Sequence, residues 1–323
     1  MKAIVHNTYG PADVLAEQEI EMPELTDEGV LVRVRAASIN PADLYGLLGR
    51  PLLVRLSGGL RKPKDTRLGV DFAGTVEAVG QAVTGFRVGD EVFGGKSGAL
   101  AQYVLVGDGV VLKPANITFE DAAAVPVAAI TALQGLRDKG QIQSGQKVLI
   151  NGASGGVGTF AVQIAKAFGA EVTAVCSSRN LELARSLGAD HVIDYTREDY
   201  TRSGQRFDLI LDLAGSKSWS ESRRILKTQG RLVLVGAPKG SALFGPLGHI
   251  AKVRIAAFRS SQKVQFFIAK MNRADLLVLR EFLETGKVKP VIDRRYTSSQ
   301  VVDAFRYLGE GHARGKIIIA FDN

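Results

Sequence analysis

The sequence predicts an α/β protein in which a doubly wound, parallel-sheet domain is inserted into a discontinuous β-rich domain. Short β-type runs separated by Gly, Pro and Asp fill about the first 110 residues. From Gln146 onward, strand-like and helix-like stretches alternate, which is typical of a parallel sheet. After about residue 262 this pattern ends, and the last apolar run is expected to return to the first domain. We therefore expect the domain boundaries at residues 1–122, 123–262 and 263–323, with the first and third segments forming one domain.

The β-rich domain is predicted from apolar runs bounded by turn-forming residues. These runs cover residues 2–5, 30–36, 70–79, 91–93 and 101–106. Residues 114–120 are expected to form a loop or short turn. The alanine-rich residues 121–139 that follow favour a helix in spite of Pro126.

The inserted domain is predicted from strands with helices between them. The strands are expected at residues 147–151, 171–177, 191–195, 208–213 and 231–235, and the helices at residues 156–168, 180–187 and 218–227. The closing region predicts helix 273–285, strand 291–296, helix 298–310 and strand 316–321.

Composition excludes several classes of protein. Hydrophobic residues make up 46% and charged residues 23%, as in an ordinary globular protein. No apolar stretch approaches the roughly 20 residues that span a bilayer, and the opening six residues are strand-like rather than a signal sequence. We therefore expect a cytoplasmic protein with no membrane partner. The single cysteine, Cys176, excludes intrachain disulfides and multi-cysteine metal sites, and is expected to be buried rather than reactive.

The net charge of +8 is compatible with an anionic partner. The basic residues are scattered, with the densest groups at residues 50–67 and 252–270, and neither group matches a recognised nucleic-acid module. A basic surface around a phosphate-rich cofactor is the plainer interpretation, and nucleic acid is not the expected partner.

The most informative motif is Lys-Val-Leu-Ile-Asn-Gly-Ala-Ser-Gly-Gly-Val-Gly at residues 147–158. It lies between a predicted strand and a predicted helix, which is the context that a dinucleotide-binding turn requires. The spacing Gly-x-Gly-x-x-Gly is met with Ala153 in the first position. Backbone N–H groups and the positive end of the helix can then face a pyrophosphate. The alternative is a flexible loop. We predict cofactor contacts at Gly152, Ser154, Gly155, Gly156, Val157 and Gly158.

The end of the second strand of this domain indicates which dinucleotide binds. An NAD site has a carboxylate there, which accepts hydrogen bonds from the ribose and repels a 2′-phosphate. Here the strand leads into Ser177, Ser178 and Arg179, with no acid at that end. Hydroxyls and a guanidinium suit phosphate oxygens, so NADP(H) is favoured over NAD(H). The alternative is that Ser178 caps the next helix and Arg179 is solvated.

An ordered set of motifs along nearly the whole chain resembles the medium-chain dehydrogenase/reductase superfamily. The motifs lie at residues 38–43, 69–80, 89–93, 101–104, 123–126, 131–132, 286–290 and 311–316, together with the glycine turn. Within this superfamily, the chain is similar to the zinc-independent quinone oxidoreductase branch, which includes alkenal and enone reductases. The resemblance implies a Rossmann NADP-binding domain inserted in a GroES-like domain. It also implies a homodimer whose sheets meet near Lys263 to Phe267.

The chain departs from the zinc alcohol dehydrogenases of that superfamily. Where those enzymes carry the first ligand cysteine, it has Asn40, and where they carry Gly-His-Glu, it has Gly69-Val70-Asp71. A catalytic zinc needs about three protein ligands. The histidines are widely separated and are expected to be surface or packing residues; they are His6, His191, His249 and His312. No metal is expected.

Without a metal, reduction of a plain ketone lacks the strongest stabiliser of its developing alkoxide. A quinone, or a carbonyl conjugated to a C=C bond, is easier to reduce because the charge of the hydride delocalises onto an enolate or hydroquinone oxygen. We therefore expect NADPH to deliver hydride to such a small apolar acceptor, in a cleft between the domains.

Three residues are candidates for the catalytic site. Asn40 is predicted to line the nicotinamide side, where its amide orients cofactor or substrate, and the resemblance implies that Thr131 lies beside the nicotinamide. Tyr45 is a candidate proton donor, although a packing role is equally compatible with the sequence. Asp43 is more typical of a structural partner within its turn than of a general acid. Solvent or the cofactor ribose can supply the proton instead.

The resemblance implies further cofactor contacts. It places Tyr195 near the adenine and 2′-phosphate, Gly236 and Ala237 along the nicotinamide half, and Lys316 near the cofactor in the closing segment. Phe266 and Phe267 fit an apolar cleft wall or a subunit edge, or simple core packing. The basic segment at residues 50–67 departs from the family pattern and is expected to form a lid or an apolar mouth.

Two other functions compete with the reductase. One is an NADPH-binding sensor or regulatory protein with little turnover, and the other is a nucleic-acid-binding protein that uses the basic surface. Asn40 and Thr131 beside the predicted cofactor site favour the enzyme.

Overall fold

The computed structural model describes residues 1–52, 54–236 and 247–321. The chain forms two units, which we call the β-rich unit (Met1–Ile130 with Met271–Asn323) and the parallel-sheet unit (Thr131–Lys270). The predicted α/β class and the insertion of one domain into the other are confirmed. The boundaries between the units lie after Ile130 and after Lys270, later in the chain than the predicted boundaries at residues 122 and 262. The helix α4 (Pro126–Gln134) runs through the first boundary, and the strand β13 (Lys263–Phe266) completes the sheet of the parallel-sheet unit.

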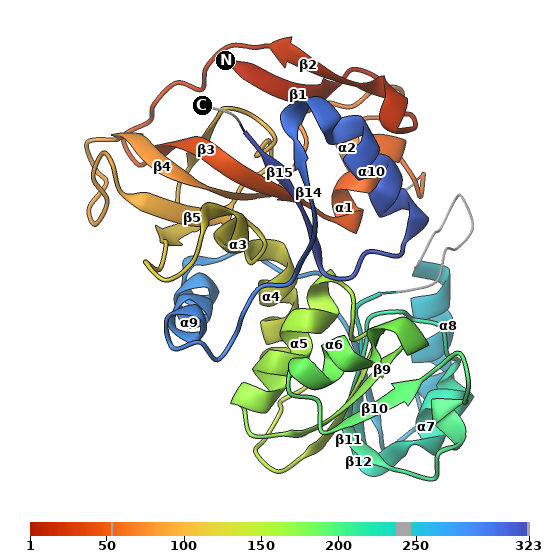
Figure 1. Cartoon of the computed structure of the whole chain (residues 1–323). Helices are drawn as coiled ribbons and strands as arrows, with labels where there is room; N and C mark the ends of the chain where they lie inside the picture. Colours follow the sequence, from red (N-terminus) through yellow and green to blue (C-terminus); the bar gives the residue numbers. More distant parts are fainter. Residues whose placement is uncertain (53, 237–246, 322–323) are drawn as a thin grey trace. The chain divides into compact units, whose positions relative to one another are not determined.

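The parallel-sheet unit is built on one sheet with the order β10-β9-β8-β11-β12-β13 in the described residues. All of its neighbouring strands are parallel (Figure 1). Its other strands are β8 (Lys147–Asn151), β9 (Glu171–Cys176), β10 (His191–Asp194), β11 (Phe207–Asp212) and β12 (Leu226–Leu234). The order reverses between β8 and β11, and ligands bind at such switch points in open α/β sheets.

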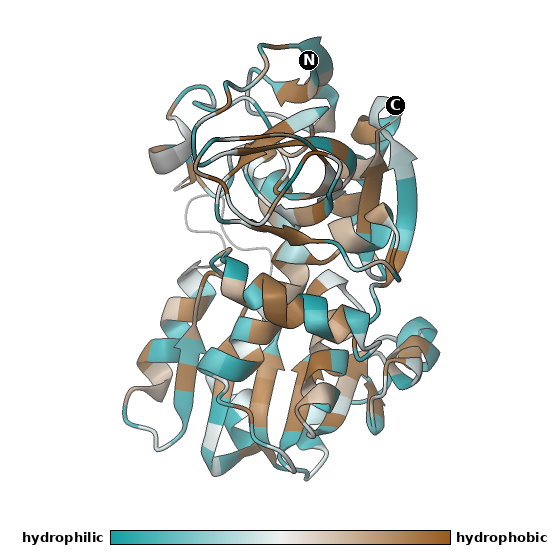
Figure 2. Ribbon diagram, turned by 90° about the vertical axis from the view of Figure 1, so that its left-hand side faces the viewer, coloured by the Kyte–Doolittle hydropathy of each residue, from teal (hydrophilic) through white to brown (hydrophobic). Residues whose placement is uncertain are grey.

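Helices cover both faces of this sheet. They are α5 (Gly156–Ala167), α6 (Leu181–Ser186), α7 (Trp219–Arg224) and α8 (Leu247–Ala257). Because crossovers between parallel strands are right-handed, α5 and α6 lie on one face and α7 and α8 on the other (Figure 1). The strands between them are largely apolar (Figure 2). Val148, Leu149 and Ile150 of β8 are fully buried, which accounts for the continuous apolar run that precedes the glycine turn.

The β-rich unit contains a larger sheet with the order β14-β15-β3-β4-β5-β7, in which β6 also pairs with β3, and a separate pair β1-β2. Its strands are β1 (Lys2–His6), β2 (Leu15–Glu19), β3 (Val30–Ile39), β4 (Asp71–Val79), β5 (Glu91–Gly95), β6 (Tyr103–Val106), β7 (Val110–Leu112), β14 (Ile292–Thr297) and β15 (Lys316–Ala320). The strand β15 runs antiparallel to β3, with Ile317 opposite Ile39. This pairing confirms that the end of the chain returns to the first domain (Figure 1).

The helices of the β-rich unit are short. Besides α4, they are α1 (Pro41–Leu48), α2 (Val54–Gly58), α3 (Phe119–Ala123), α9 (Arg273–Glu284) and α10 (Val301–Glu310). Side chains of β3, β4 and β5, among them Val32, Phe72 and Val92, form its core together with Phe305 of α10.

Several predicted elements differ from the structure. Residues 121–139 are helical over nearly their whole length, as predicted, but they are divided into α3, α4 and a π-helical turn at Gly135–Lys139. Pro126 begins α4, since a proline lacks the N–H that a continuing helix needs. The helix predicted at residues 218–227 ends at Arg224, because residues from Leu226 already belong to β12. The sequence patterns did not indicate α1, α2, α8, β2 and β7. No helix in the described ranges combines the length and the apolar character needed to cross a membrane.

Candidate cofactor and active site

The glycine turn begins where β8 ends. Gly152 has a φ of 86°, a left-handed conformation that favours glycine. Its N–H and that of Ala153 both donate to the carbonyl of Val175 in β9, at 3.1 Å each. The turn is therefore tied to the neighbouring strand at the carboxyl edge of the sheet, beside the switch point.

The helix that follows the turn begins with N–H groups that have no acceptor within the helix itself. Gly155 is the N-cap of α5 and provides no side-chain cap, so the first N–H groups of the helix, at Gly156, Val157 and Gly158, are oriented toward its N-terminal end. A Cβ atom at Gly158 would lie 2.2 Å from the carbonyl oxygen of Gly152. Only glycine therefore allows this close approach of helix and turn. The cradle fits the pyrophosphate of a dinucleotide.

Asn180 joins the glycine turn to the end of β9. Its Nδ2 atom donates to Ser154 Oγ at 2.9 Å and to Ser177 Oγ at 3.2 Å. Asn180 is 5% exposed. It fixes two of the predicted cofactor residues relative to each other. Asn180 was not predicted as a site residue, because it belongs to no motif and its role depends on contacts across the turn.

A carboxylate from the neighbouring strand β10, that of Asp194, lies beside the end of β9. Ser178 Oγ donates to Asp194 Oδ2, and the other oxygen of that carboxylate accepts from the N–H and hydroxyl of Thr196, at 2.9 and 2.6 Å. The prediction rested on the residues that follow β9 in the chain, Ser177 to Asn180, which include no acid. Asp194 comes from the adjacent strand, where the parallel register sets it beside Cys176. Tyr195 follows it and is largely exposed, as is Arg179.

Two buried side chains are hydrogen-bonded to each other between β8 and β11, at the switch point. Asn151 Nδ2, at the end of β8, donates to Asp212 Oδ1, at the end of β11, at 2.8 Å. The same oxygen accepts from the N–H of Gly215 at 2.8 Å. Burial raises the pKa of Asp212. Gly236 N–H donates to the carbonyl of Asp212, so this predicted residue lies at the same edge. The predicted residue Ala237 lies outside the described residues.

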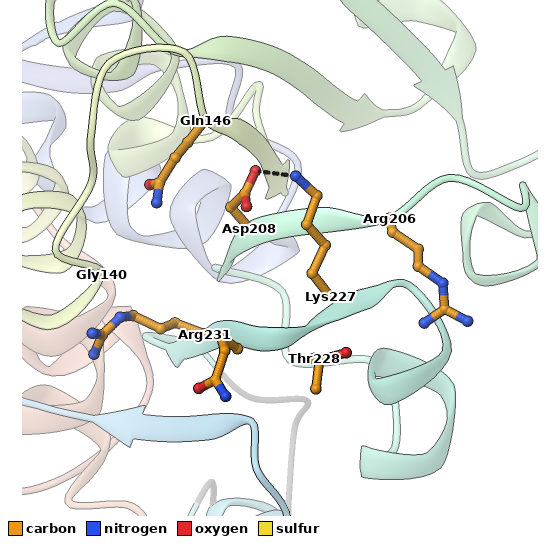
Figure 3. Close-up of a pocket in the computed structure, with 8 residues that line it drawn as sticks. Gly140, Gln146, Arg206, Asp208, Lys227, Thr228 and Arg231 are labelled. Atoms are coloured by element: carbon orange, nitrogen blue, oxygen red, sulfur yellow. Dashed lines mark hydrogen bonds and ion pairs between the residues drawn. The ribbon is translucent and has the colours of Figure 1, made fainter.

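A hollow of about 670 Å³ at the opposite, amino-terminal edge of the sheet does not resemble a binding site. Its cations include Arg206, Lys227 and Arg231. Asp208 neutralises Lys227 at 2.8 Å, and the two arginines extend in opposite directions (Figure 3). The cations therefore do not converge on one ligand.

The second predicted group of residues lies in the β-rich unit. Asn40 precedes α1, and its backbone N–H donates to Asp43 Oδ2 at 2.7 Å. Asn40 Nδ2 donates to Asp71 Oδ2 at 2.9 Å, and Asn40 Oδ1 accepts from Lys316 Nζ at 2.6 Å. All of these side chains are buried. The structure thus brings together Asn40, Asp43 and Lys316, which were predicted separately from the sequence.

Asp71 is the centre of this cluster. Its Oδ2 atom accepts from Ser38 Oγ at 2.8 Å and from Lys316 Nζ at 3.2 Å, besides Asn40. Its Oδ1 atom accepts from the N–H of Val127 at 2.8 Å, in the first turn of α4. Asp71 has no exposed surface. This carboxylate therefore ties β3, β15, α1 and α4 together, and it was noted from the sequence only as a departure from a zinc ligand motif.

The carboxyl group of Asp43 has a raised pKa. Burial raises the pKa of its carboxyl to about 7, the nearby charge of Asp71 adds to this, and the N–H of Asn40 opposes it in part. The hydrogen bond to Asn40 agrees with the predicted role of Asp43 as a structural partner in its turn.

The remaining predicted residues differ in burial. Thr131 in α4 is 8% exposed, whereas Tyr45 on α1 is 38% exposed. Cys176 is buried, as predicted, and burial raises the pKa of its thiol to about 11. Phe266 packs against the core of the parallel-sheet unit, and Phe267 lies beside Gly135.

The basic segment at residues 50–67 presents apolar side chains to solvent. Leu52, Leu56 and Leu60 are 42, 67 and 69% exposed. Arg55 holds the segment to the unit, because its guanidinium lies over the ring of Tyr9 and its Nε donates to the carbonyl of Gly49 at 3.0 Å. Arg55 therefore holds the segment to the unit, while the three leucines are exposed to solvent.

Within the described ranges, no group of three or more His, Cys, Asp or Glu residues could hold a metal ion. His6 is buried, which lowers its pKa, and His191 pairs with Glu171 at the surface, at 3.1 Å. The positive charge inside the cluster around Asp71 comes from Lys316.

Comparison with known proteins adds to this geometry. Residues 26–116 match the alcohol dehydrogenase GroES-like domain, and residues 187–319 match a family described as zinc-binding dehydrogenase. The chain is 37% identical to a 2-methylene-furan-3-one reductase of Solanum lycopersicum and 36% identical to an NADPH-dependent alkenal/one oxidoreductase, chloroplastic, of Arabidopsis thaliana. Each match covers 99% of this chain and 79% of the relative.

A solved structure is similar over the whole chain. The quinone oxidoreductase from Coxiella burnetii has a TM-score of 0.87 and 30% sequence identity, and the match covers 99% of both chains.

Proposed function

Because the chain belongs to the medium-chain dehydrogenase/reductase family and to its quinone and enone reductase branch, we propose that it is an NADPH-dependent, zinc-independent reductase. The proposed acceptors are quinones and α,β-unsaturated carbonyl compounds. The observation that carries the proposal is the pairing of Lys316 with Asn40 and Asp71, because it supplies a positive charge without a metal.

The parallel-sheet unit supports NADPH binding. When bound, NADPH supplies a hydride to the acceptor. The N–H groups of Gly156 to Gly158 would hold the pyrophosphate, and Asn180 would keep Ser154 and Ser177 in place. Arg179 would bind the 2′-phosphate, and Tyr195 would lie along the adenosine half. Gly236 and Ala237 are proposed to line the nicotinamide half.

The β-rich unit supports chemistry without zinc. Asn40 and the Gly69-Val70-Asp71 segment occupy the motif positions that resemble the zinc ligands of alcohol dehydrogenases. In this chain a lysine ammonium lies 3.2 Å from Asp71 and 2.6 Å from Asn40. A metal cation would have to share these groups with the ammonium, and the two charges would repel each other.

The acceptor side is proposed from two buried residues, Asn40 of the β-rich unit and Thr131 of α4, and from exposed residues of the β-rich unit. Asn40 and Thr131 would orient the nicotinamide or the acceptor. Tyr45 is exposed enough to reach solvent or substrate and would donate the proton to the enolate. The exposed Leu52, Leu56 and Leu60 would form an apolar mouth for a hydrophobic acceptor.

We also propose a homodimer and a cytoplasmic location. The strand β13 is an edge strand of its sheet, with one side free of a strand partner in the described residues. Pairing of two such edges would join two copies. Light scattering that detects only a monomer would remove the dimer, and cell fractionation tests the location.

One panel of acceptors tests the activity. NADPH oxidation is measured with 1,4-benzoquinone, 9,10-phenanthrenequinone, short enones and 2-alkenals, before and after treatment with a zinc chelator. The proposal expects turnover that the chelator does not change. Tight NADPH binding without turnover on any acceptor would favour the sensor, and salt-sensitive retention of RNA would favour the nucleic-acid function.

A further inference from the structure

The basic segment at residues 50–67 presents two leucines on one face. The N–H of Arg55 donates to the carbonyl of Leu52 at 3.0 Å, so a helical turn begins at Leu52 and continues into α2. Leu52 and Leu56 are four residues apart, and side chains with this spacing lie on the same face of a helical stretch. Both are exposed. The segment therefore has an apolar face toward solvent.

A third exposed leucine lies in the loop that follows α2. The N–H of Lys64 donates to the carbonyl of Gly58 at 2.8 Å, which closes this loop at the end of the helix. Tyr9 Oη donates to the carbonyl of Gly59 at 2.7 Å and holds the loop to the β-rich unit. Leu60 follows directly and is exposed. Because the backbone beside it is held, its exposure is a property of the folded loop.

Positive charge accompanies these leucines. The basic segment contains six basic residues and one acid. That acid, Asp65, is paired with Arg67 at 3.0 Å. The exposed basic side chains of the segment are Arg50, Arg61, Lys62 and Lys64. They precede Leu52 or follow Leu60, so the exposed surface of the segment is both apolar and positively charged.

This combination of side chains favours a lipid surface over a macromolecule. No aromatic residue occurs at residues 50–67, although single-stranded nucleic acid stacks on aromatic side chains and protein interfaces are enriched in them. Lysine is depleted in protein interfaces. Leucine combined with lysine and arginine is instead typical of surfaces that bind at the boundary between the headgroups and acyl chains of a bilayer. Binding of this kind needs no segment that crosses the bilayer.

We propose that the basic segment is a docking surface for an anionic phospholipid bilayer. Leu52, Leu56 and Leu60 enter the headgroup region, and the exposed arginines and lysines contact the lipid phosphates. The cytoplasmic surface of cell membranes is anionic, in agreement with the proposed location. Hydrophobic acceptors dissolve in the same layer, so docking is compatible with the proposed apolar mouth. The inference does not depend on hydride transfer.

Flotation of the whole protein with lipid vesicles tests the inference, without NADPH or acceptor. The vesicles contain phosphatidylcholine alone or phosphatidylcholine with phosphatidylserine. We expect the wild-type protein to float with the phosphatidylserine vesicles and to be released by salt, because salt screens the attraction. Binding to phosphatidylcholine alone should be at least about tenfold weaker, since each cation near an anionic surface strengthens binding about fivefold.

Two variants remove the apolar and the charged parts of the surface separately. The leucine variant combines Leu52→Ser, Leu56→Ser and Leu60→Ser. The cation variant combines Arg61→Gln, Lys62→Gln and Lys64→Gln. Each should weaken binding to the phosphatidylserine vesicles by about tenfold or more, because less apolar area is buried or less charge is attracted.

The matched controls change exposed side chains of the same kinds elsewhere in the β-rich unit. The apolar control combines Leu25→Ser, Val88→Ser and Leu277→Ser. The charge control combines Lys96→Gln, Lys287→Gln and Lys289→Gln, and so alters the net charge as much as the cation variant does. Both controls should bind the vesicles like the wild type. Losses as large in the controls as in the variants would overturn the inference.

Other results would also overturn it. If the wild-type protein does not float, the segment is not a bilayer surface, and a leucine variant that turns a dimer into a monomer in light scattering assigns the leucines to a second copy of the chain. A leucine variant that floats like the wild type leaves no role for the leucines in docking. Salt-sensitive retention of RNA by the wild type would then indicate a nucleic-acid partner instead.

Thermal melting checks that each variant folds. Should the leucine variant not fold, Leu56→Ser and Leu60→Ser are measured singly, and each should weaken binding severalfold. The acceptor panel uses soluble acceptors without vesicles, whereas flotation uses neither cofactor nor acceptor. Failure of docking with normal turnover therefore overturns this inference alone, and docking without turnover overturns the proposed function alone.

Discussion

The hydroxyl of Ser178 donates a hydrogen bond to the carboxylate of Asp194 on the adjacent strand. Hydrogen bonds from Ser178 and Thr196 lower the pKa of Asp194, so this carboxylate is charged at neutral pH. A negative charge therefore lies one hydrogen bond away from a residue proposed to bind the 2′-phosphate. The preference for NADPH must then come from cations strong enough to outweigh it.

Asp194→Asn is expected to increase the preference for NADPH over NADH. The substitution removes the negative charge and weakens the hold on the Ser178 hydroxyl, which can then turn to the phosphate. The ratio of kcat/KM values for NADPH and NADH should rise severalfold, corresponding to about 1 kcal/mol. Steady-state kinetics with both cofactors measures it, and a fall in the ratio would show that Asp194 supports the phosphate site instead.

Arg179→Ala is expected to raise the KM of NADPH about tenfold, since a charge-assisted hydrogen bond to phosphate is lost. The KM of NADH should hardly change. Arg185→Ala is the matched control, because it removes a guanidinium from α6 that pairs with Glu182. An unchanged ratio of the two KM values in Arg179→Ala would contradict the assignment of the 2′-phosphate site.

Gly158→Ala is expected to destabilise the parallel-sheet unit and to weaken NADPH binding. The new Cβ would meet the backbone oxygen of Gly152 at 2.2 Å, so the start of α5 must move. The free energy of unfolding should fall by about 1–3 kcal/mol, as for other overpacked sites. Urea unfolding without cofactor measures this loss.

Gly155→Ala is the control for that measurement. Its φ is −79°, and a Cβ there would meet only the Gly152 oxygen, at an ordinary 3.6 Å. The stability of this variant should equal or slightly exceed that of the wild type. Equal stability of the two alanine variants would contradict the close approach at Gly158.

Asp43 is expected to make stability depend on pH. Its pKa in the folded state is raised to about 7 from the ordinary value of 3.8. Between these values the unfolded state loses the proton and the folded state keeps it. The free energy of unfolding should therefore fall as pH rises from about 4 to about 7, by at most about 1.4 kcal/mol per pH unit, and then level off.

Asp43→Asn should remove this contribution, because the amide oxygen still accepts from the N–H of Asn40 but does not titrate. Urea unfolding of both proteins at several pH values between about 4 and about 8 gives the two slopes. Identical slopes would show that Asp43 does not titrate in this range.

The glycine turn could be predicted because all of its determinants lie within one short segment. The apolar run of β8, the glycines and the amphipathic helix follow one another in the chain, and local sequence specifies such turns. The alternation of strands and helices likewise predicted the doubly wound parallel sheet of this unit. Local patterns did not reveal α1, since its apolar stretch is short and begins at Pro41.

Contacts across strands could not be predicted in the same way. Asp194 lies beside Ser178 only because β10 pairs with β9 in one register. Asn40, Asp71 and Lys316 were each noted in the sequence, but their contact depends on the pairing of β3 with both β4 and β15. The missing information was therefore the register of strands far apart in the chain.

The bond between Asn40 and Lys316 joins residues 276 positions apart, so during synthesis Asn40 is made long before its partner. The parallel-sheet unit is continuous and can fold as soon as it leaves the ribosome. The β-rich unit cannot be completed at that stage, because its buried Asp71 lacks the positive charge of Lys316 until β15 has been synthesised. The strands β3 and β4 are thus synthesised before the parallel-sheet unit but completed after it, and a chain that ends before Lys316 would leave them open to proteases and chaperones.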